Sequence, residues 1–318
     1  MGDSLTRVRT VYLGTTDFAS TVLDRLAGSA HRPALVVSRP DRRRGRGRRT
    51  QSPPVVDRAR ELGIEVLQPE HLNDPETVGQ IAAAAPEALC VCAYGALIGE
   101  RLLAAHPSYN VHPSLLPRWR GAAPVERAIQ AGDRQTGVSI MRPIAELDAG
   151  PVFLASSLPI EPGEDYGTLA PRLAALGGDL LVRALDQRPE PEPQPHEGVT
   201  YADKVERDER RLDPARGAAE LERTVRALNP HVGTWVEDPA DGERLGVRRA
   251  RVATAEGASP ADHATQGALV TTADRLVLAT ADGDLELLEV QPPGGRAMSA
   301  ADYLRGRVRP DGHTVTGE

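Results

Sequence analysis

The chain of 318 residues is longer than one hydrophobic core usually supports, so we expect two domains. With 40% apolar and 26% charged residues, the composition excludes a disordered chain. A net charge of -7 argues against a nucleic-acid partner only if the charge is evenly spread, and it is not. No apolar run precedes the first predicted strand, and Pro86 and Glu87 interrupt the most apolar window. We therefore expect a cytoplasmic protein without a signal peptide or a membrane span.

Short apolar runs alternate with amphipathic segments through the first part of the chain. Predicted strands cover residues 9–14, 33–38, 64–69, 87–94 and 108–114, and predicted helices cover residues 17–29, 54–63, 74–86 and 123–132. Two later strands are predicted at residues 136–144 and 150–160, and a long helix at residues 166–187. This alternation is typical of an α/β fold with a Rossmann-like, mostly parallel sheet.

The two cysteines lie in the predicted strand at residues 87–94. A disulfide framework needs more cysteines at wider spacing, so we expect Cys90 and Cys92 to be two buried strand residues rather than a disulfide or a metal site.

A proline-rich segment follows the long helix, with four prolines and three acidic residues between Arg188 and Thr200. Prolines at this density favour an extended spacer. We therefore predict a catalytic domain at residues 1–187, a linker at 188–205 and a C-terminal domain at 206–318. After a helix at residues 218–229, that last domain has short strands joined by Gly and Asp turns, which indicates a small OB-like β-barrel.

The segment YNVHP places an amide and an imidazole two residues apart, at Asn110 and His112. On a strand, both side chains lie on one face, and the carboxyl end of a parallel strand opens into the crevice where such sheets bind ligands. Asp148, on a glycine-containing loop between two predicted strands, can complete an acid–base set with them. A hydrogen-bonded histidine with a purely structural role remains the alternative.

These residues lie in blocks that resemble a known family. NVHPSLLPRWRGAAP at residues 110–124 and ELDAG at 146–150 resemble the formyl-transfer domain that uses 10-formyltetrahydrofolate, and PRWRGAAP is similar to methionyl-tRNA formyltransferases in particular. Further blocks match in the same order, namely GTTDFA, the arginine-rich insertion, CVCAYG, YADKV and GRAMSAADYL. The chain departs from the family at Pro113, where glycine is common, and proline removes a backbone donor and fixes φ.

The resemblance implies a function and a set of site residues. Asn110, His112 and Asp148 correspond to the family's catalytic residues, and the folate-contacting turn corresponds to Ser114, Leu115, Leu116 and Pro117. The implied reaction moves the formyl group of 10-formyltetrahydrofolate, the co-substrate, to the α-amine of initiator methionyl-tRNA for translation initiation. No metal is implied, and we expect a monomer. Asn110 and His112 are expected to hydrogen-bond the oxyanion, while Asp148 orients the imidazole.

The stretch from Arg39 to Arg49 carries seven arginines and one aspartate in an acidic chain. Arginine forks match phosphate oxygens, so an RNA substrate gives this loop a role, although a solvated charged loop is the simpler alternative. The predicted tRNA contacts are Arg42, Arg43, Arg44, Arg46, Arg48, Arg49 and Lys204. VRRAR at residues 247–251 is either a further contact or an exposed strand face.

Two other functions remain open. A formyltransferase for a sugar or another small-molecule amine, or a formyltetrahydrofolate hydrolase, can share the Asn-His-Asp set. A non-catalytic tRNA-binding protein can use the barrel and the arginine loop, but it does not need those three residues. Dinucleotide binding is not expected, because GTTDFA lacks the second and third glycines of that fingerprint.

Overall fold

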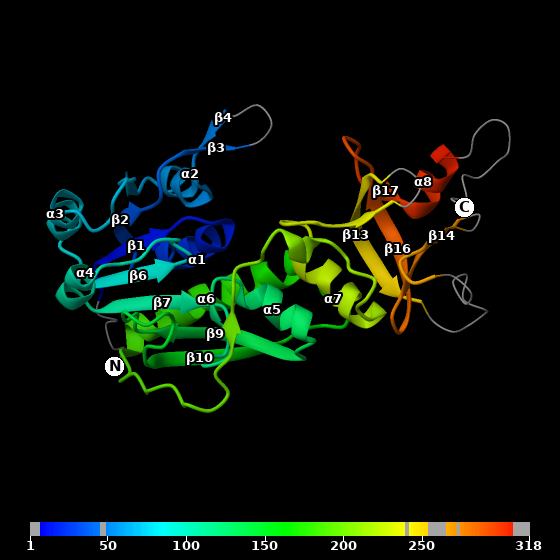
Figure 1. Cartoon of the computed structure of the whole chain (residues 1–318). Coiled ribbons are helices and arrows are strands. Elements are labelled where there is room, and N and C mark those ends of the chain that lie inside the picture. Colours follow the sequence, from blue (N-terminus) through cyan, green and yellow to red (C-terminus); the bar gives the residue numbers. More distant parts are fainter. Residues whose placement is uncertain (1–6, 45–48, 239–241, 254–264, 272–273, 308–318) are drawn as a thin grey trace. The chain divides into compact units, whose positions relative to one another are not determined.

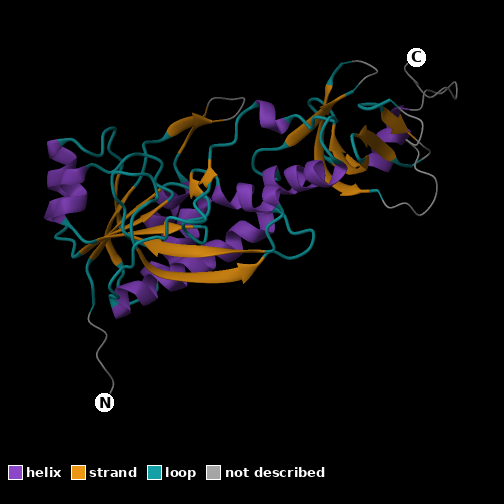
Figure 2. Cartoon of the chain, turned by 60° about the horizontal axis from the view of Figure 1, so that its bottom comes forward, coloured by secondary structure: helices purple, strands orange, loops and turns teal. Residues whose placement is uncertain are grey.

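The computed structural model describes residues 7–44, 49–238, 242–253, 265–271 and 274–307 (Figures 1 and 2). The chain divides into two compact units, which we describe separately. Unit 1 comprises Met1–Pro124, Gln135–Pro159 and Leu169–Asp203, and unit 2 comprises Val125–Arg134, Ile160–Thr168 and Lys204–Glu318. Both units combine segments from distant parts of the chain. The predicted division at residues 187/188 and 205/206 remains a prediction.

Unit 1 is built on a seven-stranded sheet in the order β10-β9-β7-β6-β1-β2-β5 (Figure 1). Its strands are β1 (Thr10–Gly14), β2 (Pro33–Val37), β5 (Glu65–Leu67), β6 (Ala88–Cys92), β7 (Ser108–His112), β9 (Gln135–Met141) and β10 (Val152–Pro159). The pairs among β5, β2, β1, β6 and β7 are parallel, whereas β9 and β10 are antiparallel to their neighbours. Every residue of β1 and β6 is buried, as in a sheet covered on both faces. The predicted Rossmann-like, mostly parallel sheet is confirmed.

The helices of the first unit follow the predicted alternation. They are α1 (Asp17–Ala27), α2 (Pro54–Glu61), α3 (Pro75–Ala83), α4 (Glu100–Ala105) and α6 (Tyr166–Gln187), the last of which starts in unit 2. Thr16 caps α1 by accepting a hydrogen bond from the backbone N–H of Ala19, and Asp74 caps α3 in the same way. Sequence analysis missed α4, a helix of six residues without a side-chain cap.

The proline-rich segment is hydrogen-bonded to unit 1 at two places. Glu192 exchanges two backbone hydrogen bonds with Val152 of β10, with N···O distances of 2.8 and 2.9 Å. Farther along, β11 (Tyr201–Ala202) pairs in parallel with β8 (Arg120–Gly121). The prolines prevent a continuous ladder, but Glu192 lies between two of them and keeps its N–H.

Unit 2 is an antiparallel strand domain with the order β12-β13-β16-β15-β14, and β17 pairs with β16. These strands are β12 (Thr234–Glu237), β13 (Arg244–Val252), β14 (Leu269–Thr271), β15 (Leu276–Thr280), β16 (Gly283–Gln291) and β17 (Met298–Ser299). Its helices are α5 (Pro124–Ala131), η1 (Asp208–Arg210), α7 (Ala218–Leu228) and α8 (Ala300–Arg307). In the described residues β12 and β14 are the edges of this sheet, so the predicted barrel is observed as a half-barrel. No helix in the described part of the chain combines the length and apolar character of a membrane span.

Candidate active site

Strand β7 carries two polar side chains on the same face. Asn110 is partly exposed and lies opposite Met141 of β9, whereas His112 is buried and lies opposite Ser139. Val91 of β6, the penultimate residue of that strand, pairs with Asn110. Asn110 and His112 therefore lie where the parallel strands end, as predicted.

Both ring nitrogens of His112 face oxygen atoms. Nε2 lies 2.8 Å from the carbonyl oxygen of Trp119, and because a carbonyl only accepts, Nε2 must carry the hydrogen. Nδ1 lies 3.5 Å from Oδ2 of Asp148, and the two side chains are 5% and 13% exposed. The carboxylate predicted to orient the imidazole is thus beside it, in a nearly dry environment.

The two residues that flank the imidazole have unusual backbone conformations. Trp119 has φ of 62° and Asp148 has φ of 49°, both in the left-handed region that non-glycine residues rarely adopt. Such conformations persist only where surrounding contacts fix them, and they cluster at functional sites. The backbone N–H of Trp119 donates to Oγ1 of Thr200 at 2.9 Å, which is one of those contacts.

The Asp148 carboxylate accepts one hydrogen bond from the backbone. The N–H of Gly121 donates to Oδ2 at 3.0 Å, the same oxygen that faces His112. Among the described residues, no group donates to Oδ1. This oxygen is therefore available to accept a proton or a hydrogen bond from a ligand.

One detail of the predicted chemistry changes. Sequence analysis expected Asn110 and His112 to donate to the same oxyanion, but in the observed conformation Nε2 of His112 donates to the Trp119 carbonyl and Nδ1 faces Oδ2 of Asp148. Nδ2 of Asn110 donates to Sδ of Met141 at 3.4 Å, and a thioether is a weak acceptor. A developing oxyanion can replace it, so Asn110 is the available donor.

The turn after His112 is held from inside the protein. Ser114 is fully buried and its hydroxyl donates to the carbonyl of Arg118 at 2.5 Å. The contact of this turn with a folate stays a prediction. Oγ of Ser139, also fully buried, accepts from the N–H of Leu116 at 3.1 Å and donates to the carbonyl of Ser114 at 2.8 Å. Leu115, Leu116 and Pro117 are partly exposed.

Pro113 fits this turn despite its departure from the family pattern. The N–H of Ser114 donates to the carbonyl of His112 at 2.9 Å, which closes a three-residue turn centred on Pro113. An inverse γ-turn requires a central φ near -75°, which lies within the range to which the proline ring restricts φ.

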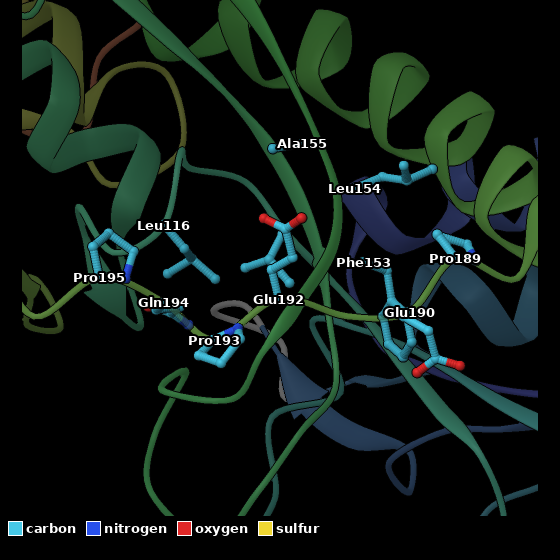
Figure 3. Close-up of a pocket in the computed structure, with 11 residues that line it drawn as sticks. Leu116, Phe153, Leu154, Ala155, Pro189, Glu190, Glu192, Pro193, Gln194 and Pro195 are labelled. Carbon is cyan, nitrogen blue, oxygen red and sulfur yellow. The ribbon is translucent and has the colours of Figure 1, made fainter.

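A pocket of about 410 Å³ lies between β10 and the proline-rich segment (Figure 3). Its wall includes Leu116, Phe153, Glu190, Glu192 and Gln194. The two carboxylates disfavour the anionic groups of a folate or an RNA, so we assign this pocket to neither substrate.

The predicted tRNA contacts are only partly described. β3 (Arg42–Arg44) and β4 (Arg49–Gln51) form an antiparallel hairpin, and the side chain of Arg42 is exposed. Arg46 and Arg48 lie outside the described residues. The hairpin follows β2, three strands from β7, which is roughly 14 Å at the usual strand spacing. Lys204 is exposed and follows β11 by two residues.

The buried thiols do not contribute a nucleophile. Burial raises the pKa of Cys92 to about 12, although a hydrogen bond with Tyr12 opposes that shift, and burial raises the pKa of Cys90 as well. Both thiols are therefore neutral at physiological pH. The described residues hold no group of three or more His, Cys, Asp or Glu side chains that could bind a metal.

Sequence analysis missed the residues that orient the predicted ones. Gln194 donates to the carbonyls of Asp148 and Gly150, Ser139 holds the turn, and Trp119 contributes its carbonyl. No local pattern marks these contacts, which join residues 7 to 46 positions apart. The proline-rich context of Gln194 indicated a spacer instead.

Comparisons with known proteins agree with this geometry. The formyl transferase family matches residues 7–185, and the formyl transferase C-terminal domain matches residues 204–308. Proteins named methionyl-tRNA formyltransferase from Halorhodospira halophila and Ruegeria pomeroyi are 44% and 41% identical, over 96% of this chain and 99% of each relative. The fold is similar to that of HypX from Aquifex aeolicus solved with tetrahydrofolic acid, with a TM-score of 0.61 and 17% identity, over 94% of this chain and 47% of that one. The chain therefore belongs to the formyl transferase family and, within it, to the methionyl-tRNA formyltransferases.

Proposed function

We propose that this protein transfers the formyl group of 10-formyltetrahydrofolate to the α-amino group of methionyl initiator tRNA, for translation initiation. The observation that carries the proposal is the position of His112 between the Trp119 carbonyl and the Asp148 carboxylate, on the strand that also presents Asn110. A histidine with a purely structural role does not need a neighbouring amide such as that of Asn110, whose observed hydrogen bond to a thioether is weak. All three side chains come from one chain, so a monomer suffices, and a tRNA substrate is consistent with the cytoplasm.

Asn110 stabilises the negative charge that develops on the formyl oxygen. Its amide exchanges a weak contact with the Met141 thioether for a hydrogen bond to an oxyanion, which is much stronger. Loss of one such donor typically lowers turnover by roughly 10²- to 10³-fold. In this proposal Asn110 therefore acts on the transition state more than on substrate binding.

Asp148 and His112 handle the proton of the attacking amine. The α-amine attacks in its neutral form, so it must lose a proton as the new C–N bond forms. Oδ1 of Asp148 accepts that proton directly or through water, while the N–H of Gly121 keeps Oδ2 in place beside the His112 ring. As the tetrahedral intermediate collapses, the bond between the formyl carbon and N10 of the folate breaks, and N10 takes the proton back from Asp148, so tetrahydrofolate leaves without a covalent bond between the enzyme and the formyl group.

The residues around Asn110, His112 and Asp148, the trio of predicted catalytic residues, fit a folate. Leu97, Ile144 and Leu147 are exposed apolar side chains, on the loops that follow β6 and β9, and both of these strands neighbour β7. Exposed apolar side chains beside a polar site suit a flat pterin ring. Leu115, Leu116 and Pro117 supply the rest of the folate contacts in this proposal, with Ser114 supporting them from inside.

The arginine hairpin supplies phosphate contacts for the acceptor end of the tRNA. β3 and β4, which contain Arg42, Arg43, Arg44 and Arg49, follow β2 at the carboxyl edge of the sheet. In the sequence Arg46 and Arg48 lie between them, and Lys204 adds one further cation. An arginine fork can bind a phosphate in a bidentate manner. The half-barrel of unit 2 provides an additional tRNA surface in this proposal.

The test is formylation by the purified protein with 10-formyltetrahydrofolate as donor. We expect transfer to methionyl initiator tRNA, weaker transfer to methionyl elongator tRNA, and no transfer to sugar amines or glycinamide ribotide. Preferred transfer to a small amine would favour the alternative formyltransferases. Release of free formate without an acceptor would indicate a hydrolase, and folate-independent tRNA binding without turnover would indicate a binding protein.

A further inference from the structure

The side-chain amide of Gln194 has its hydrogen-bonding capacity filled. Nε2 donates to the carbonyl of Asp148 and to that of Gly150, both at 2.7 Å. Oε1 accepts from Nε and Nη2 of Arg120, at 3.0 and 2.9 Å. Arg120 is itself buried, and Gln194 is half-buried, so these contacts are shielded from competing water.

The two carbonyls that Gln194 binds belong to the loop that carries the catalytic carboxylate. Asp148 has positive φ, and a Cβ at Gly150 would lie 1.8 Å from the carbonyl oxygen of Arg142. Glycine at position 150 thus permits the close approach to Arg142, whereas the positive φ of Asp148 is locally disfavoured and must be fixed by surrounding contacts. Because φ and the carbonyl direction of Asp148 set the direction of its Cα–Cβ bond, fixing that carbonyl fixes where the carboxylate points.

The same proline-rich segment also supports the Trp119 carbonyl, which accepts the hydrogen of His112 Nε2. Oγ1 of Thr200 accepts the N–H of Trp119, whose carbonyl receives Nε2 of His112. The pairing of β11 with β8 then holds Gly121, whose N–H donates to Asp148. The segment thus contacts the backbone of each residue that faces the imidazole.

The prolines explain how an irregular segment can hold a side chain in place. Prolines alternate with Glu190, Glu192 and Gln194 over residues 189–195, and each ring restricts φ before folding. Glu192 anchors this stretch to β10 two residues before Gln194. Less backbone entropy is then lost when the segment that carries Gln194 becomes ordered.

We propose that Gln194 is a positioning residue for Asp148 and that it sets the carboxylate against the His112 ring. This inference rests on the proposed function, since it assigns Asp148 a role in formyl transfer. Gln194 does not contact the reacting atoms. Its contribution therefore passes through Asp148 and is lost when Asp148 has no carboxylate.

The test replaces Gln194 with glutamate in the full chain. Gln194→Glu retains an acceptor for Arg120 but removes both donations and places a carboxylate against two carbonyls. We expect the kcat for formylation to fall about 10- to 100-fold, as a displacement near 1 Å can cause, with little change in KM for either substrate. Gln194→Met, which removes the polar atoms at similar size, serves if the glutamate variant does not fold.

Unit 2 offers a matched control. Gln291 accepts from Nε and Nη2 of Arg248 and donates to the carbonyl of Gly295, which is the same chemistry without a contact to the Asp148 loop. Gln291→Glu should leave the pH profile of kcat unchanged. Gln194→Glu should change that profile in the same direction as Asp148→Asn does.

Two further measurements decide the outcome. In an Asp148→Asn background, Gln194→Glu should cost less than about threefold in kcat, because residues that act as a unit are not additive. The nitrogen NMR shift of His112 Nδ1 should move in Gln194→Glu as in Asp148→Asn, and it should stay unchanged in Gln291→Glu. Wild-type kcat in Gln194→Glu or Gln194→Met, or a full loss on top of Asp148→Asn, would overturn the proposal. If the wild type does not formylate methionyl-tRNA, the proposed function fails, while the His112 shift still decides the positioning.

Discussion

Two arginine–glutamine pairs in this molecule have the same local chemistry and different surroundings. In unit 1, Arg120 binds Oε1 of Gln194, whose amide holds two carbonyls of the Asp148 loop. In unit 2, Arg248 binds Oε1 of Gln291, whose amide holds the carbonyl of Gly295. The first pair holds a loop that carries a carboxylate beside an imidazole, and the second holds a turn after β16. The comparison teaches that an arginine–glutamine pair affects catalysis only if the loop it holds carries a catalytic side chain.

The largest effect is expected from removing the Asp148 carboxylate, whose loop is held by the Arg120–Gln194 pair. Asp148→Asn should lower kcat by about 10²- to 10⁴-fold, the range of a lost general acid–base group. The asparagine still offers an oxygen to the N–H of Gly121, so the fold should remain. Steady-state formylation with thermal unfolding as the control checks this. Turnover at the wild-type rate would remove Asp148 from the mechanism.

A smaller effect, confined to the tRNA, is expected from the arginine hairpin. Replacing Arg42, Arg43 and Arg44 with alanine should lower kcat/KM for methionyl-tRNA and reduce the slope of log(kcat/KM) against log[salt] by about 2 to 3. The KM for the folate should not change. Arg25→Ala, at an exposed arginine on α1, is the control. An unchanged salt slope in the triple variant would rule out the phosphate contacts.

Two buried serines provide the next comparison. Ser139→Ala removes both contacts of a fully buried hydroxyl and should lower the free energy of unfolding by about 1–3 kcal/mol. Since that hydroxyl also holds the turn after His112, kcat should fall about tenfold. Ser38 is equally buried, but its hydroxyl has no hydrogen-bond partner among the described residues. Ser38→Ala should therefore leave stability unchanged or raise it, as chemical denaturation can show. Equal losses in the two variants would contradict this account.

The smallest effect concerns the acid stability of unit 2. Burial alone would raise the pKa of Glu286, but hydrogen bonds from Arg275 and Arg251 outweigh it and lower the pKa below the ordinary value of 4.5. A lowered folded-state pKa stabilises the fold above the unfolded value, and this contribution is lost as the pH falls through the folded pKa. Glu286→Gln should therefore cost about 1 kcal/mol at neutral pH and nothing in strong acid. Urea unfolding followed by Trp235 fluorescence in a Trp119→Phe background checks this, and a pH-independent difference would refute it.

Much of the fold and the chemical identity of the site could be predicted from the sequence. The buried runs of β1 and β6 and the helix-forming periods around them specify an α/β sheet through local preferences alone. Period two along β7 is sufficient to place Asn110 and His112 on one face. The trio itself was identified by family resemblance, since the residue types are common.

What could not be predicted depends on contacts between distant residues. The prolines after α6 indicate an extended chain, but no local rule says that Glu192 pairs with β10 or that Gln194 reaches the Asp148 loop. Positive φ at Trp119 and Asp148 likewise results from tertiary contacts, because both residues disfavour it locally. The position of the His112 ring, with Nε2 donating to the Trp119 carbonyl and Nδ1 facing Asp148, follows from these contacts, so the assignment of the oxyanion to Asn110 required the structure.

The central claim is that the His112 ring donates from Nε2 to the Trp119 carbonyl and turns Nδ1 toward the Asp148 carboxylate, and the most direct measurement is the tautomer of that ring. In protein labelled with ¹⁵N-histidine, at a pH where the imidazole is neutral, long-range ¹H–¹⁵N correlation reports which nitrogen carries the hydrogen. We predict that it is Nε2, donating to the Trp119 carbonyl, and that Asp148→Asn changes the shift of Nδ1 much more than that of Nε2. A hydrogen on Nδ1 with a bare Nε2, or no response of Nδ1 to Asp148→Asn, would contradict this arrangement.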